Sequence, residues 1–187
     1  MSQNKKIVLI VVLALVISCC LLCVLTAVLV PNLLSKTFST DPAKAKATGA
    51  QIVDYTMPPG YQEMMGMDMF FEQIVLLGRE DKRGVTIMLF QIKATNVSRD
   101  QMEQQMRQAF QRQFSNGSSQ MTPVGTRTVK IKNQSVTLNI SESTGSTPLR
   151  QAIGVFPGKG GLAMVMLTGT VREWDWDMLD AFFQSMR

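Results

Sequence analysis

The stretch VTIMLFQI, residues 85–92, decides the fold class of this chain. Its apolar residues fall on both sides of the two-residue period of a strand, and β-branched and aromatic side chains favour strands. A strand that is apolar on both faces needs cover on both faces. The stretch therefore predicts the central strand of a sheet on which helices pack.

Alternating apolar and polar residues on either side of this stretch predict further strands. Two strands precede it and are followed by a turn at residues 79–84. Four strands follow it as two hairpins, turned at Asn133-Gln134 and at residues 157–161. We expect an antiparallel sheet of about seven strands, with strands at residues 61–69, 73–77, 85–92, 124–132, 135–142, 149–156 and 162–168.

Three helices are predicted around this sheet. Asp41 is suited to cap the first, which has Pro42 in its first position and stops before the Met-Pro-Pro-Gly turn at residues 57–60. Its expected apolar stripe is Ala43, Ala47, Ala50 and Val53.

The second and third helices have stronger apolar faces. Ser98 and Gln101 form a capping box at the start of the second helix, which runs to about Phe114; its apolar face is Met102, Met106, Ala109, Phe110 and Phe114. Asp175 caps the third helix, at residues 176–186, whose buried face is expected at Met178, Leu179, Phe182, Phe183 and Met186.

Residues 7–30 carry no charge, consist mostly of Val, Leu, Ile and Ala, and end at Pro31. As a helix this segment would be roughly 36 Å long, which exceeds a hydrocarbon core of about 30 Å. We therefore predict a single transmembrane helix. It divides the chain into a cytoplasmic head (1–6), the membrane helix (7–30), a tether (31–40) and one soluble α+β domain (41–187).

The orientation of this helix rests on the short head. Lys5 and Lys6 flank one end of the segment, and Lys36, Lys44 and Lys46 follow the other, so the positive charges do not decide it. A short head with two lysines is typical of a signal anchor. We expect a single-pass protein of the cell membrane with its C-terminal domain outside the cytoplasm.

The cysteines offer two alternatives to a plain anchor. Val16-Ile17-Ser18-Cys19 resembles a bacterial lipobox, in which cleavage would leave Cys19 lipidated, although the sequence stays apolar beyond it. Cys19, Cys20 and Cys23 could also be acylated in a eukaryote. The third interpretation is that they are small apolar residues facing lipid or a partner helix.

Composition excludes several function classes. The chain has three cysteines, all inside the predicted membrane segment, and no histidine. A disulfide, a Cys/His zinc site, a Ser-His-Asp triad and a Cys-His dyad are therefore excluded for the soluble domain. Its basic residues are scattered, and its net charge is only mildly positive, so nucleic acid is not an expected partner.

Three short motifs suggest chemistry, and each has a structural interpretation that we favour. The methionine-rich run at residues 63–69 could hold Cu(I) through thioethers, but Met65, Met67 and Met69 would share one strand face, with Met64 on the other, as core residues. Asp175, Asp177 and Asp180 fit helix capping better than a carboxylate or calcium site. Residues 154–160 miss the spacing of a phosphate loop and read as a hairpin turn.

Two further patterns concern the surface. Asn96, Asn116, Asn133 and Asn139 each begin an Asn-X-Ser sequon, which matters only in a eukaryotic secretory pathway. Trp174 and Trp176 could mark an interaction surface beside the last helix, although burial in the core is the favoured interpretation.

The order of these elements resembles PsbP/Mog1-like domains placed behind a single membrane anchor. Pro-Pro-Gly-Tyr stands before a run of antiparallel strands, and a central helix, further hairpins and a final helix ending Phe-Phe-Gln-Ser-Met follow, over residues 50–187. The resemblance implies an α/β/α sandwich around an antiparallel sheet. It implies binding to other proteins or a role in assembly, and no catalytic residue carries over.

We therefore expect a membrane-anchored, extracytoplasmic binding or assembly module rather than an enzyme. Its expected partners are the membrane and a protein near the membrane surface, and no catalytic, cofactor-binding or metal-binding residue and no cofactor is assigned. One alternative is a hydrolase that uses carboxylates or a serine with a lysine. Another is a binder of lipid or a small apolar ligand, which predicts an apolar cavity lined by methionines.

Overall fold

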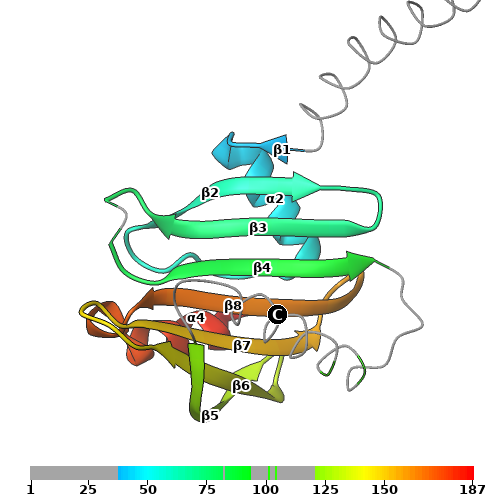
Figure 1. Ribbon diagram of the computed structural model, residues 1–187. Helices are drawn as coiled ribbons and strands as arrows, with labels where there is room; N and C mark the ends of the chain where they lie inside the picture. Colours follow the sequence, from blue (N-terminus) through cyan, green and yellow to red (C-terminus); the bar gives the residue numbers. More distant parts are fainter. Residues whose placement is uncertain (1–37, 82, 94–100, 102–103, 105–120) are drawn as a thin grey trace, which may run out of the picture. The chain divides into compact units, whose positions relative to one another are not determined.

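The computed structural model describes residues 38–81, 83–93, 101, 104 and 121–187 (Figure 1), all within one compact unit, Phe38–Arg187. None of the helices among these residues is long and apolar enough to cross a membrane. The predicted transmembrane segment at residues 7–30, with its three cysteines, lies outside the described residues.

Eight strands form one antiparallel sheet in the order β1-β2-β3-β4-β8-β7-β6-β5. This is one strand more than expected, because Phe38 and Ser39 of the predicted tether pair with Met67 and Gly66. The strands are β1 (Phe38–Ser39), β2 (Tyr61–Asp68), β3 (Glu72–Arg79), β4 (Thr86–Lys93), β5 (Met121–Ile131), β6 (Gln134–Ser143), β7 (Leu149–Pro157) and β8 (Gly161–Thr170).

Strand β4 is central, as its sequence predicts. It lies between β3 and β8, with Leu89 opposite Val75 on one side and Val165 on the other. All three side chains are fully buried. Strand β4 therefore joins the first half of the chain to the last four strands.

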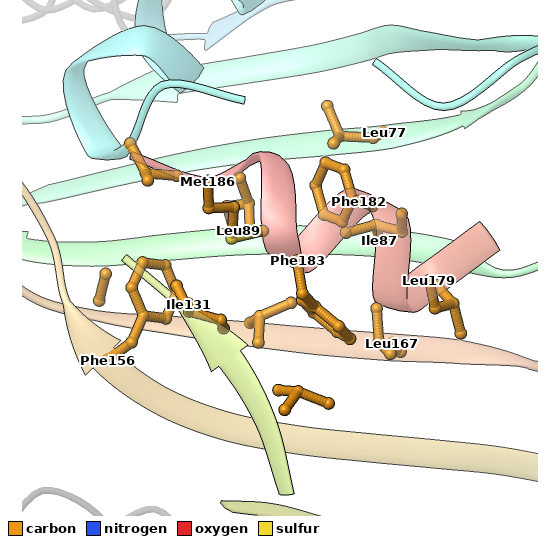
Figure 2. Close-up of a cluster of buried hydrophobic side chains, with 14 of the residues drawn as sticks. Leu77, Ile87, Leu89, Ile131, Phe156, Leu167, Leu179, Phe182, Phe183 and Met186 are labelled. Carbon is orange, nitrogen blue, oxygen red and sulfur yellow. The ribbon is translucent and has the colours of Figure 1, made fainter. Parts of the chain in front are cut away.

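Two helices, α2 (Pro42–Ile52) and α4 (Trp176–Ser185), pack on the same face of the sheet, and a short 3-10 helix η1 (Val171–Glu173) precedes α4. Figure 2 shows Leu179, Phe182 and Phe183 of α4, and Met186 directly after it, lying over Leu77, Ile87, Leu89 and Leu167. Full burial of one such side chain contributes about 1.5–3 kcal/mol to the stability of the fold. The layer between the helices and the sheet contains most of the described core.

Helix α2 begins as predicted but buries a different face. Asp41 Oδ1 accepts a hydrogen bond from Ala43 N at 2.9 Å, which caps the helix. Its buried residues are Ala45, Thr48, Gly49 and Ile52, whereas Ala43, Ala47 and Ala50 are exposed. A Cβ on Gly66 would lie 2.7 Å from Ala45 Cα, so two small residues let this helix approach the sheet closely. The expected alanine stripe was wrong because alanine alone does not indicate which face is buried.

The opposite face of the sheet is rich in methionine. In register, Met88 lies between Leu76 and Met166, and Phe90 lies between Ile74 and Met164. Leu76, Met88, Phe90 and Met166 are partly buried, while Met164 is buried. This methionine face consists of Met64, Met65, Met67, Ile74, Leu76, Met88, Phe90, Ile153, Val155, Met164 and Met166.

A β-bulge brings Met64 to the methionine face. The register of β2 against β3 shifts between Glu63 and Met65, so Met64 has no partner of its own. Its sulfur lies 2.6 Å from the place that a Cβ on Gly78 would occupy. Simple alternation placed Met64 on the other face from Met65 and Met67, and the bulge corrects this.

The predicted helix at residues 98–114 lies almost wholly outside the described residues. Gln101 and Gln104 are described, and both are helical and exposed. The structure thus describes an α+β domain with an eight-stranded sheet and two helices on one face.

The β5–β6 hairpin turns at Lys132 and Asn133, one residue earlier than expected, with φ values of 52° and 60°.

Candidate functional site

A groove of about 710 Å³ lies beside α4, at the end of the sheet where β2 starts and β3 ends. The turn before β2 and the outer side of α4 contribute apolar side chains, and the ends of β3 and η1 contribute charged ones. The lining residues are Thr56, Met57, Pro58, Pro59, Tyr61, Arg79, Gly84, Glu173, Asp175, Met178, Ala181, Phe182 and Ser185.

The Met57-Pro58-Pro59-Gly60 sequence shapes one wall of this groove. Gly60 has a φ of 76°, which glycine tolerates best, and Tyr61 N donates to Pro58 O at 3.0 Å to close the turn. Next to it, Thr56 N donates to Ser185 Oγ at 2.9 Å. The turn is thereby fixed against the last turn of α4.

The polar side chains of the groove, apart from Thr56, have partners within the chain. Arg79 pairs with Asp81 at 3.1 Å, and this carboxylate raises the pKa of the exposed Arg79 guanidinium. Ser185 Oγ donates to Phe182 O at 2.7 Å, so its hydroxyl is used to hold the helix end. Thr170 Oγ1 donates to Glu173 at 2.9 Å.

Tyr61 and Asp175 are also used to hold the backbone. Tyr61 Oη accepts a hydrogen bond from Val85 N at 3.2 Å. Burial raises the pKa of Tyr61, and the hydrogen bond from Val85 partly offsets that rise. Asp175 Oδ1 caps α4 by accepting from Asp177 N and Met178 N at 3.0 and 3.1 Å. These side chains thus hold the backbone that shapes the groove.

The two tryptophans lie together beside the start of α4. The Trp174 and Trp176 rings meet edge to face with centroids 5.4 Å apart. The Arg127 guanidinium lies 4.4 Å from the centre of the Trp176 ring and pairs with Asp180 at 2.6 Å. Arg150 lies 5.5 Å from the centre of the Trp174 ring. The predicted pair is thus a half-buried aromatic contact between β5, β7 and α4.

The aspartates of the predicted cluster serve separate structural roles. Asp175 caps α4, Asp177 lies in its first turn, and Asp180 pairs with Arg127. Among the residues described, no group of three or more His, Cys, Asp and Glu side chains could hold a metal ion.

The glycine-rich stretch at residues 154–160 is a strand and a hairpin turn, as predicted. Lys159 Nζ pairs with Asp54 at 2.6 Å instead of facing an open loop. Gly158 and Gly160 pass so close to the Gln91 amide that a Cβ on either would meet it. Of the sequons, Asn133 lies in a turn and Asn139 inside β6, whereas Asn96 and Asn116 lie outside the described residues.

Sequence reasoning missed the groove because its walls are distant in the chain. Met57 and Phe182 line the same groove only because α4 packs beside the start of β2. The sequence did contain one signal, the Pro-Pro-Gly-Tyr turn. That turn was interpreted as the end of the preceding helix and not as one wall of a groove.

No family model and no curated protein matches the chain. Among solved structures, cyanobacterial PsbP (CyanoP) from Synechocystis sp. PCC 6803 is 12% identical, over 73% of this chain and 92% of that one, with a TM-score of 0.48. LpqN, involved in cell envelope biogenesis of Mycobacterium tuberculosis, is 11% identical, over 72% and 81%, with a TM-score of 0.38. The first of these carries the PsbP name.

Proposed function

We propose that this protein is a membrane-anchored binding module, with its domain outside the cytoplasm, whose groove receives an apolar segment of a partner protein. The observation that carries this proposal is the groove itself, a largely apolar concavity in which the polar side chains other than Thr56 are hydrogen-bonded within the chain. A groove of this volume falls in the range of about 300–1,000 Å³ that is usual for binding sites.

The chemistry of the groove favours binding over catalysis. A serine nucleophile needs a base that accepts its proton, but Ser185 donates to a backbone carbonyl. A general acid or base needs a carboxyl group free to meet substrate, but Asp175 caps a helix and Glu173 accepts from Thr170. What the groove offers a ligand is the apolar surface of Met57, Pro59 and Met178.

The flexible thioethers of Met57 and Met178 suit a partner with large apolar side chains. Methionine adapts its shape to the surface that it meets, and it is common at protein interfaces. Pro58 and Pro59 restrict the backbone of the opposite wall, so that wall loses little conformational entropy when a ligand binds. We infer that a short segment carrying one or two such side chains is the ligand.

Photo-crosslinking in native membranes tests the groove. The full chain carries p-benzoylphenylalanine in place of Ala181, which is exposed and lines the groove, or in place of Gln184, which is exposed on α4 outside it. We expect one discrete protein adduct from position 181 and none from position 184. Met57→Asp should abolish the adduct, whereas Lys46→Asp, on the exposed side of α2, should leave it unchanged.

Two results would contradict the proposal. Equal, diffuse adducts from both positions would mean that α4 meets bulk protein only. Adducts from position 181 that contain lipid and no protein would replace the protein ligand by a lipid one.

We propose further that the helix predicted at residues 98–114 covers the methionine face and completes an α/β/α sandwich. The apolar side chains predicted for that helix match a face whose Leu76, Met88 and Phe90 are partly buried. Gln101 and Gln104 are both helical and exposed, which supports this proposal because the solvent side of such a helix is polar.

A further inference from the structure

An exposed aromatic tip lies at the end of the sheet opposite the groove. Phe70 and Phe71, in the turn between β2 and β3, are 85% and 67% exposed. Large exposed side chains of this kind are uncommon on soluble proteins unless they meet a partner. Six large hydrophobic side chains are exposed among the described residues, and four of them, Phe38, Met69, Phe70 and Phe71, make up this tip; the others are Val124 and Leu149.

The tip is held by the sheet rather than left to move freely. Met69 N donates to Glu72 O at 2.8 Å, and Lys93 N donates to Phe71 O at 2.9 Å. The rings of Phe70 and Phe71 meet edge to face with centroids 4.8 Å apart. Two phenyl rings are therefore presented together to solvent on a fixed backbone.

The described part of the domain begins at this same end of the sheet, and the predicted membrane segment precedes it in the sequence. Phe38 pairs in register with Met67, three residues before Phe70, and β1 lies beside the end of β2 that leads into the tip (Figure 1). Only residues 31–37 separate Phe38 from the predicted segment at 7–30. Even fully extended, that connection spans no more than about 25 Å.

We propose that the aromatic tip, Phe38, Met69, Phe70 and Phe71, inserts into the boundary between headgroups and acyl chains of the bilayer. This inference rests on the proposed membrane anchoring and adds a second contact with the same membrane. The apolar faces of interfacial helices are buried about 5–10 Å deep in that boundary, and an exposed aromatic turn can occupy the same layer. An interfacial phenylalanine pair loses its contact with water there, while its backbone keeps the hydrogen bonds of the sheet.

The contact is hydrophobic rather than electrostatic. Lys93, at the base of the tip, pairs with Asp68 at 2.7 Å, so these two charges largely cancel. Insertion should therefore not depend on anionic lipid. It should also persist at high salt, which screens charge attraction but does not weaken hydrophobic burial.

The test uses the full chain reconstituted in phosphatidylcholine vesicles, with and without phosphatidylglycerol. p-Benzoylphenylalanine replaces Phe70 or, as the control, Val124, which is 54% exposed on β5 at the far edge of the sheet. Mass spectrometry after illumination identifies the adducts. We expect lipid adducts from position 70 in both vesicle types and at high salt, and none above background from position 124.

Each other outcome counts against the inference. Protein adducts only, or none, from position 70 would assign the tip to a protein partner or to solvent. Lipid adducts from position 70 only with phosphatidylglycerol would replace hydrophobic insertion by charge attraction. Carbonate washing of the same vesicles separates the two proposals: a chain that is washed off has no anchor, and both fail, whereas a retained chain without lipid adducts overturns the tip alone.

Discussion

Tyr55 lies between α2 and α4, where its ring meets Phe182 edge to face at 5.8 Å. Its hydroxyl donates to Glu63 Oε1 at 3.3 Å. Burial raises the pKa of Tyr55 well above its usual value of 10.0, and the charge of Glu63 and this hydrogen bond raise it further. The phenol is therefore held neutral where an exposed tyrosine would already ionise.

This pKa shift predicts a loss of stability at alkaline pH. Above the ordinary tyrosine pKa the unfolded chain releases the proton that the folded chain keeps. The contribution of Tyr55 to the free energy of unfolding is therefore complete below about pH 10. Above that pH the free energy of unfolding falls by up to about 1.4 kcal/mol per pH unit. Thermal unfolding followed across this range checks the expectation.

The matched control is Tyr55→Phe, which should flatten the alkaline decline. Tyr61, the other tyrosine of the chain, has a pKa raised mainly by burial and should keep a residual decline in that variant. Near-ultraviolet absorbance of the phenolate provides a direct reading. Ionisation of both tyrosines near the usual pKa, in a chain that is still folded, would contradict the assignment.

At the scale of elements, the methionine face shows why β4 is apolar on both sides. Leu89 faces α2 and α4, whereas Met88 and Phe90 face the other way and are only partly buried. One helical layer therefore accounts for half of the pattern that the strand carries. We propose the helix at residues 98–114 as the cover of the other half.

A pair of substitutions on β4 tests this second layer. Met88→Asp would place a charge beneath the proposed helix and should lower the free energy of unfolding by about 3 kcal/mol or more. Thr86→Asp, on the same strand and the same face but exposed, should change it by no more than about 0.5 kcal/mol. Chemical denaturation of the full chain in mild detergent measures both.

The same experiment identifies the covering element. Met106→Asp, on the predicted apolar face of that helix, should cost as much as Met88→Asp. If Met88→Asp proves as harmless as Thr86→Asp, the methionine face meets solvent and the sandwich is wrong.

At the scale of the whole molecule, the groove and the aromatic tip lie at opposite ends of β2. Tyr61 starts this strand at the groove, and Asp68 ends it at the tip. At about 3.3 Å per residue the strand separates the two by roughly 23 Å. A domain that rests its tip on a bilayer would turn the groove away from the lipid, where a protein segment can reach it.

The proposed orientation predicts which side of the membrane carries this groove. In sealed vesicles of known sidedness, protease added from the extracytoplasmic side should remove the domain at residues 41–187. Protease added from the cytoplasmic side should leave it intact. Cleavage from the cytoplasmic side alone would reverse the topology and, with it, the compartment of the partner.

The sequence by itself determined the elements of the domain, because their signals are local. Asp41 and Asp175 were identified as helix caps from one or two neighbours, and residues 85–92 as a central strand from their own apolar pattern. Side-chain period and capping act over a few residues, so one sequence contains them. The resemblance to PsbP/Mog1-like domains likewise follows from the order of such elements.

Tertiary structure alone decided which surfaces meet. The exposed Ala47 and the buried Ala45 have identical side chains, and only the close approach of Gly66 assigns the buried face. The groove joins Met57 to Phe182, and the tip places Phe38 beside the β2–β3 turn. Such contacts depend on how distant segments pack and pair, which a local pattern does not contain.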